Sequence, residues 1–431
     1  MKERRALTQA RSWGRIYTQG EPKLARQLSK ALDVADVGAR VMSAYTHGLH
    51  TYPARMHPIT ARRAIRITGL ETGGSLLDPF CGSGTVLVEG VLHGARCIGV
   101  DASPLAVLLS RAKTWHASDA ARAELVHRAR RISALAVEEG KAARRRTRAA
   151  APPRPLPSGV SEEARSQRLR GWFAPHVRRE LETLASCIGE EEDQDVRDAL
   201  LVVLSSILVK VSRRESDTSG RVIERRIARG MAARLFATRA EELARGLEAL
   251  WRAAPHGTPP PRVRLGDARS LGRAGVGERA VDAIVTSPPY AGTYDYLEHH
   301  LLRLTFLGIP VSELRAWELG ARRKFAGGEE KLRAALLGWE RDLADVLAQM
   351  AHVLRPGGRA VVLIGDSLAG TPPNAVPVHA GELVLRLANQ AGLDFVASAS
   401  QARTALGSAE KQAFTARPKL EHLILLERRD K

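Results

Sequence analysis

The sequence predicts an α/β fold in which a doubly wound, mostly parallel sheet is interrupted by a helical insertion. Three observations support this prediction. A strand, turn, helix and strand follow one another between Ser75 and Asp101. Short and almost continuously apolar segments return after residue 260, as expected for strands that are buried on both faces. The residues between these two groups show helical periodicity and no strand alternation.

The first part of the chain, residues 1–115, is expected to hold an N-terminal segment and the first half of the sheet. Residues 1–70 are predicted to be mixed helix and loop, with an extended stretch at 50–58 and a short helix at about 59–68. The segments SLLDPF, CGSGT, VLVEGVLHG and ARCIGVD then form one βαβ unit.

The middle part, residues 116–260, is predicted to be the helical insertion. Its clearest apolar stripe follows the i, i+3/i+4, i+7 rule and consists of Leu200, Leu204, Ile207, Leu208 and Val211. Residues 141–159 combine an Arg run with prolines, which predicts a flexible surface linker.

The last part, residues 261–431, is predicted to complete the sheet. Helices are expected at 329–353 and 380–391, and closing strands in FVASAS and HLILLER. The three central strands are expected at 263–268, 280–287 and 358–367.

Composition indicates a soluble globular protein with a polyanionic partner. Of 431 residues, 44% are hydrophobic and 26% charged, and Lys plus Arg (66) exceed Asp plus Glu (47), for a formal net charge of +19. Neutralising phosphates releases condensed counterions, which makes nucleic acid the natural partner. Biased codon usage is the alternative explanation of an Arg-rich chain, but such bias exchanges Lys for Arg and creates no net charge.

Membrane, disulfide and metal chemistry find no support in the sequence. We find no run of about 18 apolar residues and no apolar stretch behind the basic start, so we expect a cytoplasmic protein with no membrane partner. The three cysteines, Cys81, Cys97 and Cys187, are too scattered for a disulfide framework or a zinc site, and we expect no metal.

A glycine-rich bend after the first strand of the βαβ unit predicts a cofactor site. Gly82 and Gly84 permit positive φ and close approach of a ligand to the backbone. The bend lacks the Lys–Ser/Thr pair of a nucleoside-triphosphate loop and the GxGxxG spacing. Asp101 ends the next strand, about 20 residues later, where a carboxylate can accept hydrogen bonds from both ribose hydroxyls of an adenosine-containing cofactor. The alternative for Asp101 is a cap on Ser103.

Asp267 occupies the corresponding place after the third strand. Asp267 and Ala268 are both candidate cofactor contacts, and the Asp267 carboxylate is expected to bond the adenine amino group. A loop-capping role is almost equally supported.

The segment TSPPY, residues 286–290, is the candidate catalytic motif. Two prolines at a strand end remove two N–H donors and leave carbonyl acceptors free. An exocyclic base amine is a poor nucleophile, and hydrogen bonds accepted from its N–H groups return electron density to nitrogen. The Ser287 hydroxyl and the Pro288 carbonyl can accept such bonds, Pro289 completes the turn, and Tyr290 offers a face on which an extruded base can stack.

These motifs resemble those of the amino-methyltransferases of DNA. DPFCGSGT is similar to that family's cofactor motif DPFxGSGT, TSPPY to its catalytic motif, and HTYPARMHP to its additional cofactor segment. The resemblance covers residues 1–115 and 262–431, and it implies a Rossmann-like sheet of the S-adenosylmethionine-dependent type. It also implies cofactor contacts from Pro53, His57, Pro58, Asp78, Pro79, Phe80 and Thr85.

The form SPPY is found in the family's cytosine-N4 enzymes, whereas DPPY or NPPY is found in most adenine-N6 enzymes. We therefore expect a site-specific DNA methyltransferase that acts on cytosine N4, with a cognate restriction endonuclease as a candidate partner. The helical insertion is a candidate target-recognition or clamp lobe by analogy only, because it precedes the third strand and does not follow the catalytic one.

Three alternatives stay open. An RNA base-amine methyltransferase would share DPFxGSGT and the basic charge, although we identify no separate N-terminal RNA-binding domain. Adenine N6 in DNA is the second alternative. The third, a nucleic-acid-binding protein that retains only the fold, is disfavoured by the intact motifs.

Three further side chains are candidate nucleic-acid contacts. Arg213 and Arg214 lie in VKVSRRESDTSGR, a composition suited to phosphates, although a solvated helix end is equally supported. Tyr294 follows the catalytic motif and is a candidate for the base pocket, with Asp295 beside it, whereas His299 and His300 are expected to be packing residues.

Overall fold

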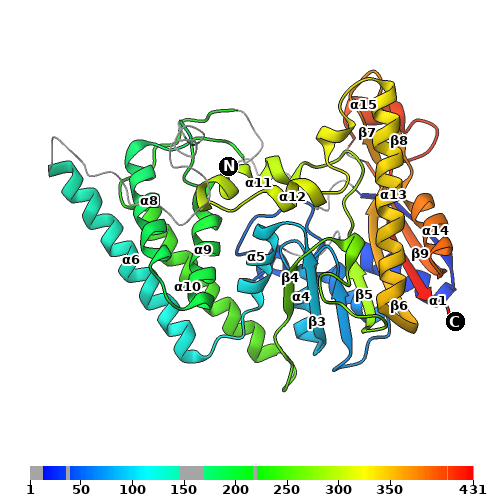
Figure 1. The fold of residues 1–431 in the computed structure, drawn as a ribbon, viewed down its shortest axis with the longest axis horizontal. Helices are drawn as coiled ribbons and strands as arrows, with labels where there is room; N and C mark the ends of the chain where they lie inside the picture. Colours follow the sequence, from blue (N-terminus) through cyan, green and yellow to red (C-terminus); the bar gives the residue numbers. More distant parts are fainter. Residues whose placement is uncertain are drawn as a thin grey trace.

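An eight-stranded sheet forms the centre of the molecule (Figure 1). The computed structural model describes residues 13–34, 39–145, 169, 171–216, 221–404 and 406–430. The strand order is β1-β9-β10-β6-β5-β2-β3-β4. The strands of this sheet are β1 Trp13–Gly20, β2 Ser75–Asp78, β3 Arg96–Asp101, β4 Arg262–Leu265, β5 Val281–Thr286, β6 Leu354–Gly365, β9 Leu393–Arg403 and β10 Leu420–Arg428. A separate antiparallel pair joins β7 (Ser367–Ala369) to β8 (Val376–Val378).

The pairing confirms the predicted Rossmann-like, doubly wound sheet. Strands β4, β3, β2, β5 and β6 are parallel, while β10 is antiparallel to both β6 and β9, and β1 is antiparallel to β9. The chain starts the parallel part at β2 in the middle, proceeds outward through β3 and β4, and then returns to β5 on the other side. The order therefore reverses between β2 and β5, which is the switch point where α/β sheets bind ligands.

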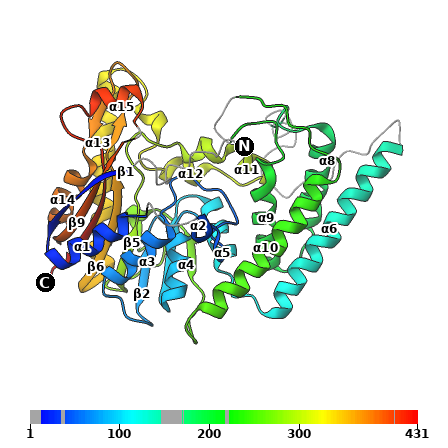
Figure 2. The same ribbon diagram turned by 180° about the vertical axis from the view of Figure 1, so that it is seen from behind.

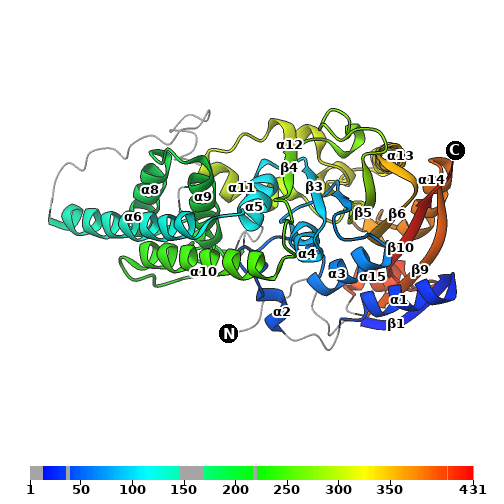
Figure 3. The same cartoon turned by 90° about the horizontal axis from the view of Figure 1, so that it is seen from below.

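Helices cover both faces of this sheet (Figures 2 and 3). Neighbouring residues of one strand face opposite sides, so Leu76 packs with the helices of one face and Leu77 with those of the other. Helices α1 (Pro22–Leu32), α3 (Pro58–Ile67) and α4 (Thr85–His93) cover the first face, and α13 (Glu329–Val353) and α14 (Ala380–Gln390) cover the second. The shorter elements are α2 Ala39–Ser43, α12 Ser312–Trp317, α15 Ser408–Ala413 and the 3₁₀ turns η2 Ala268–Ser270 and η3 Arg322–Phe325.

A helical lobe stands beside the β4 edge of the sheet (Figure 1). In the described part of the insertion between β3 and β4, four helices form it, and α5 (Pro104–Thr114) and α11 (Tyr296–Leu307) pack against them in one apolar core. The four are α6 Asp119–Arg145, α8 Pro175–Gly189, α9 Gln194–Leu208 and α10 Met231–Ala253. The predicted stripe from Leu200 to Val211 is buried in this core.

Two predictions about local structure are wrong. Residues 13–20 form strand β1, although the N-terminal segment was predicted to be helix and loop. Residues 141–145 belong to α6 and not to a linker, while the rest of that predicted linker lies outside the described residues.

Within the described ranges, no helix is long and apolar enough to span a membrane. The same part of the chain contains no cluster of three or more His, Cys, Asp or Glu side chains arranged to hold a metal ion.

Candidate functional site

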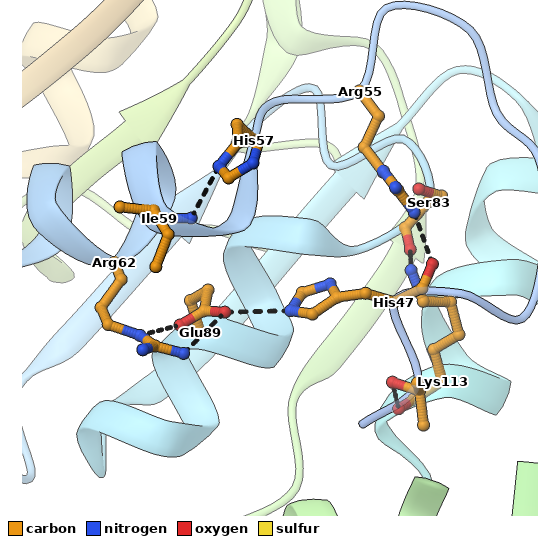
Figure 4. Close-up of polar contacts among 9 residues, drawn as sticks. His47, Arg55, His57, Ile59, Arg62, Ser83, Glu89 and Lys113 are labelled. Carbon is orange, nitrogen blue, oxygen red and sulfur yellow. Dashed lines mark hydrogen bonds and ion pairs between the residues drawn. The ribbon is translucent and has the colours of Figure 1, made fainter. Parts of the chain in front are cut away.

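The glycine bend joins β2 to α4 at the carboxyl edge of the sheet. Gly82 and Gly84 have φ values of +50° and +78°, which few other residues adopt. A Cβ atom on Gly84 would lie 2.8 Å from Ser110 Oγ, so this position is also closed by the neighbouring helix α5. The buried Lys113 Nζ, also on α5, donates to the Ser83 carbonyl at 2.6 Å and fixes the middle of the bend (Figure 4).

Asp101 faces this bend from the end of β3. Its Oδ2 accepts from Gly82 N and its Oδ1 from Ser103 N, both at 2.8 Å. The capping alternative is therefore present in the structure, and each oxygen keeps a lone pair for a further donor. Burial raises the pKa of Asp101 to about 6, and the two backbone hydrogen bonds oppose this rise.

Asp78 links the bend to the strand that carries the catalytic motif. Its Oδ1 accepts from the Thr286 hydroxyl at 2.7 Å and from Phe80 N at 3.1 Å. Burial raises the pKa of Asp78 to about 7, and the hydrogen bond from Thr286 opposes this. The ends of β2 and β5, distant in sequence, are thus fixed side by side.

One pocket brings the two predicted motifs together. Its empty space is about 770 Å³, including the part that is open to solvent, which is within the range of small-molecule sites. The predicted residues that line it are Pro53, Asp78, Phe80, Gly82, Thr85, Asp101, Ser287 and Pro289. Cys81 also lines it, but burial raises the pKa of the Cys81 thiol far above its usual range, so this cysteine stays protonated.

The remaining catalytic-motif residues, Pro288 and Tyr290, are not part of this pocket's lining. Pro288 is buried. The Tyr290 ring packs against Gly365 at the end of β6, and its hydroxyl donates to Glu421 Oε1 at 3.3 Å. The Pro289 carbonyl accepts a hydrogen bond from the Trp339 indole N–H at 3.3 Å, so α13 supports the turn from behind.

The predicted cofactor segment contributes to the pocket through Pro53, whereas His57 and Pro58 begin helix α3. His57 Nδ1 accepts from Ile59 N at 3.2 Å as the N-cap, and Pro58 occupies the first turn. Burial lowers the pKa of His57 to about 4, which keeps the ring neutral and able to accept.

Four other predicted cofactor residues lie outside the pocket lining. Pro79 and Gly84 belong to the bend itself. Asp267 caps the η2 turn that begins at Ala268, accepts from Arg269 N at 2.9 Å and forms an ion pair with the same guanidinium at 2.7 Å. The loop-capping alternative thus describes the place of Asp267 in the structure.

An aromatic wall that the sequence reasoning missed closes the pocket. Tyr52, Tyr296 and Trp317 line it, and the Tyr52 and Tyr296 rings stack with centroids 6.2 Å apart. Tyr294 lies next to this wall, 5.7 Å from the Tyr296 ring, and burial raises its pKa to about 12. The sequence TYDY at residues 293–296 indicated that tyrosines gather here, but it did not show which tyrosine would line the pocket.

Glu318 lines the same end of the pocket and holds the start of α11. Its Oε1 accepts from Tyr296 N at 2.6 Å, and Arg323 forms ion pairs with both Glu318, at 2.6 Å, and Asp295, at 2.9 Å. Asp295, expected to have a modest pocket role, is therefore held by an arginine.

The two predicted phosphate-contacting arginines lie in the helical lobe, away from the pocket lining. Arg213 is exposed, and its backbone N–H donates to the Trp172 carbonyl at 2.7 Å. The Arg214 guanidinium lies over the Trp172 ring, 4.6 Å from its centroid.

Comparison with known proteins agrees with this geometry. Residues 46–147, which include the glycine bend and Asp101, match the family model of an RMKL-like methyltransferase domain. This match and the relatives described below support a methyltransferase domain of the S-adenosylmethionine-dependent kind in the chain. The chain is 31% identical over 173 residues to the Type II methyltransferase M.MvaI of Kocuria varians, a match that covers 39% of the chain and 34% of that protein. The chain therefore spans about a third of the length of that relative.

Two further relatives differ in their named substrates or in coverage. The tRNA (guanine(10)-N2)-dimethyltransferase of Methanothermobacter thermautotrophicus is 44% identical over 50 residues, which is 12% of the chain and 15% of that protein. The crystal structure of TrmN from Thermus thermophilus aligns with 86% of the chain and 48% of its own length, with 13% identity and a TM-score of 0.34.

Proposed function

We propose that this methyltransferase transfers a methyl group from S-adenosylmethionine to an exocyclic amine of a nucleic-acid base, with cytosine N4 in DNA as the target. The observation that supports this most directly is the shared pocket, lined by Ser287 and Pro289 of the TSPPY motif and by Asp78, Gly82 and Asp101 of the cofactor half. A donor of the methyl group and an acceptor amine can therefore meet in one cavity.

The pocket residues fit an adenosine-containing cofactor. Asp101 presents two oxygens beside a bend whose positive-φ glycines leave the backbone open to a ligand. When bound, S-adenosylmethionine supplies an electrophilic methyl group on a positively charged sulfur. The Asp78 and Asp101 carboxylates lie around the same cavity, so its electrostatics suit a cationic group.

The two prolines of the catalytic turn offer no N–H donor to the target amine. Pro288 and Pro289 have no N–H, and the Pro289 carbonyl is already engaged by Trp339. The Ser287 hydroxyl and the Pro288 carbonyl are then the acceptors assigned to the amine, and positioning the nitrogen in line with the methyl group supplies much of the rate. The wall of Tyr52, Tyr296 and Trp317 offers aromatic surface on which a flipped base can stack.

The preference for DNA and for cytosine rests on the SPPY form of the motif, and adenine N6 stays the alternative base. The excess of basic residues favours a nucleic acid of either kind. We assign the helical lobe, residues 116–260, as a clamp on that nucleic acid, with Arg213 and Arg214 as candidate phosphate contacts. A cognate restriction endonuclease is the candidate protein partner.

An RNA base amine is the second candidate substrate. The 44% identity over 50 residues to a tRNA dimethyltransferase supports this candidate. The two candidates share the pocket and the chemistry, so they differ in the nucleic acid that reaches Ser287.

The decisive experiment offers methyl-labelled S-adenosylmethionine together with duplex DNA or folded tRNA and identifies the labelled nucleoside by mass spectrometry. N4-methyldeoxycytidine is the expected product, and Ser287→Ala should abolish most of it. Label that appears only in RNA would overturn the substrate assignment, and no transfer to either polymer would overturn the proposed activity.

A further inference from the structure

The hydroxyl group of Tyr290, the last residue of the catalytic motif, is held by an ion pair on strands β10 and β9. It donates to Glu421 Oε1 at 3.3 Å, and Glu421 Oε2 lies 2.6 Å from Arg403 Nη2. The side chains of Glu421 and Arg403 are only 14% and 17% exposed. Partial burial strengthens such a pair, because little water screens it. The carboxylate of Glu421 is therefore fixed in place behind the catalytic turn.

The sheet provides the space in which the Tyr290 ring reaches this ion pair. Gly365 at the end of β6 stands directly opposite Glu421 on β10, and residues paired in this way point to the same face of a sheet. A Cβ atom on Gly365 would lie 2.7 Å from Tyr290 Cε2, so a side chain there would displace the ring. Two strands that do not carry the catalytic motif therefore set where the Tyr290 hydroxyl lies.

The direction of the hydrogen bonds along this chain of groups follows from the chemistry of Glu421. Burial and the charge of Glu421 raise the pKa of Tyr290 well above its usual range, so the phenol keeps its proton. A carboxylate can only accept hydrogen bonds, which commits that proton to Glu421. The Tyr290 oxygen is then left as an acceptor, and the Ser287 hydroxyl forms a hydrogen bond with it. Ser287 is consequently the donor in that bond.

The orientation of the Ser287 hydroxyl decides what it offers to a substrate. A hydroxyl has one proton and two lone pairs. With its proton directed to Tyr290, Ser287 presents lone pairs to the pocket that it lines. An exocyclic amine needs acceptors for its N–H groups, whereas a hydroxyl proton pointed at its nitrogen would compete for the lone pair that attacks the methyl group. The chain of hydrogen bonds thus holds Ser287 in the orientation that the proposed reaction requires.

We infer that Glu421 is a positioning residue for the proposed methyl transfer: it accepts the hydrogen bond of Tyr290 and thereby makes the Ser287 hydroxyl an acceptor for the amine. This inference rests on the proposed function, and it adds a residue from β10, a strand that carries none of the predicted site motifs. It also gives the hydroxyl of Tyr290, and not only its ring, a part in the reaction.

The test replaces each group by one of similar shape and measures methyl transfer under single-turnover conditions. The substrate is duplex DNA or folded tRNA, whichever accepts label from S-adenosylmethionine. Tyr290→Phe keeps the ring, and with it any stacking, but removes the hydroxyl. Glu421→Gln keeps an oxygen for Arg403 and turns an N–H donor toward Tyr290, which reverses the chain. Each variant should slow transfer about 10- to 100-fold, while the affinity for S-adenosylhomocysteine stays within about 3-fold.

A double variant shows whether the two groups act together. If Glu421 acts through Tyr290, adding Glu421→Gln to Tyr290→Phe should slow transfer no further than Tyr290→Phe alone. Losses that multiply would mean that the two residues act independently, and this would overturn the inference. An unchanged rate in Tyr290→Phe would overturn it as well, because the ring alone would then suffice. Loss of S-adenosylhomocysteine affinity in step with the rate would indicate a merely structural role, with the same consequence.

The matched control is Glu427→Gln on the same strand. Glu427 also forms an ion pair, with Arg359 at 2.6 Å, but it lies near the other end of β10, about 20 Å from Glu421 at about 3.3 Å per residue. Its rate of transfer should equal that of the unmodified protein. Equal slowing in Glu427→Gln and Glu421→Gln would show a general effect of losing an ion pair on this strand and contradict the inference. An unmodified protein that transfers no label to either polymer would instead refute the proposed function itself.

Discussion

The proposed function gives the pocket residues two roles: some bind the cofactor, and others contact the target amine. Asp101 lies on the glycine-bend side and already accepts two backbone hydrogen bonds, whereas Ser287 directly follows strand β5. The two residues line one cavity but belong to different halves of the sheet. Their substitution should therefore affect different steps.

We expect Ser287→Ala to lower kcat about 10²- to 10³-fold, the scale of removing one positioned hydrogen-bonding group from a transition state. Cofactor affinity should change by less than about 3-fold, because Ser287 is an acceptor for the amine. Asp101→Ala should show the reverse, with the larger effect on cofactor affinity. Single-turnover rates and calorimetric affinities measure both, and a similar loss of cofactor binding in the two variants would contradict these roles.

The raised pKa of Asp101, about 6, predicts a pH dependence of cofactor binding. Because the pKa is raised above the ordinary value, the protonated form prevails below about pH 6, and a protonated oxygen no longer accepts from a ribose hydroxyl. Affinity for S-adenosylhomocysteine should therefore increase from pH 5 to pH 8. Asp101→Asn should bind more weakly and show a flatter profile; a profile as steep as that of the unmodified protein would assign the titration to another group.

The raised pKa of Asp101 also affects the stability of the protein without ligand, and here the effect of increasing pH is unfavourable. A carboxyl group whose folded pKa lies above its unfolded value favours folding at low pH, and this contribution is lost as pH rises through the folded pKa. Asp78, with a pKa raised to about 7, acts in the same direction. These groups therefore stabilise the fold less at pH 8 than at pH 5, where cofactor binding is weaker.

Trp339 is expected to act as a positioning residue for the catalytic turn. Its side chain is 3% exposed and its indole N–H donates to the Pro289 carbonyl at 3.3 Å. Trp339→Phe keeps an aromatic ring but removes this donor, so kcat should fall about 3- to 10-fold while KM for the cofactor is unchanged. A purely structural role would instead lower the thermal midpoint without this split between kcat and KM.

At the scale of helices and strands, the contact between α4 and α5 explains why Gly84 is a glycine. Its φ of +78° and the 2.8 Å distance from a built Cβ to Ser110 Oγ predict that Gly84→Ala destabilises the fold by about 1–3 kcal/mol. Denaturant unfolding measures this. Ser110→Ala in the same chain should recover only part of the loss, because the backbone strain stays.

The control for this prediction is Gly140→Ala, within α6, where a Cβ would meet nothing within 4 Å. Alanine there should be neutral or stabilise by up to about 1 kcal/mol. A destabilisation of Gly140→Ala as large as that of Gly84→Ala would show that the effect does not come from the contact with α5.

The same elements show what sequence reasoning could and could not find. The bounds of α13 were predicted correctly, and β5 to within one residue at each end, because their apolar periodicity is strong. Strand β1 was missed because WGRIYTQG is mostly exposed at the sheet edge and carries little apolar pattern.

The residues of the candidate site also fall into two groups, those that the sequence identified and those that it did not. Asp101 and Ser287 were identifiable because each follows a strand within a local motif. Tyr52, Tyr296 and Trp317 come from three segments that only tertiary packing brings together.

For the whole molecule, the net charge of +19 should govern association with nucleic acid. The helical lobe extends beyond the sheet edge (Figure 1), and its core is continuous with α11, which follows the catalytic turn. A polyanion bound to this lobe would therefore lie against the same body of helices that leads to the pocket.

Binding to duplex DNA should accordingly weaken steeply with salt, by about 10³- to 10⁵-fold between 50 and 200 mM if about 6 to 10 phosphates are contacted. Arg213→Gln should reduce the slope of log K against log salt by about 1, since the exposed Arg213 is a phosphate candidate. Fluorescence anisotropy of a labelled duplex measures these slopes, and the affinity for S-adenosylhomocysteine, a small ligand, should stay nearly constant over the same range. The charge argument applies equally to DNA and RNA. If log K depends steeply on log salt for tRNA but hardly at all for DNA, the helical lobe binds RNA and the assignment to DNA is wrong.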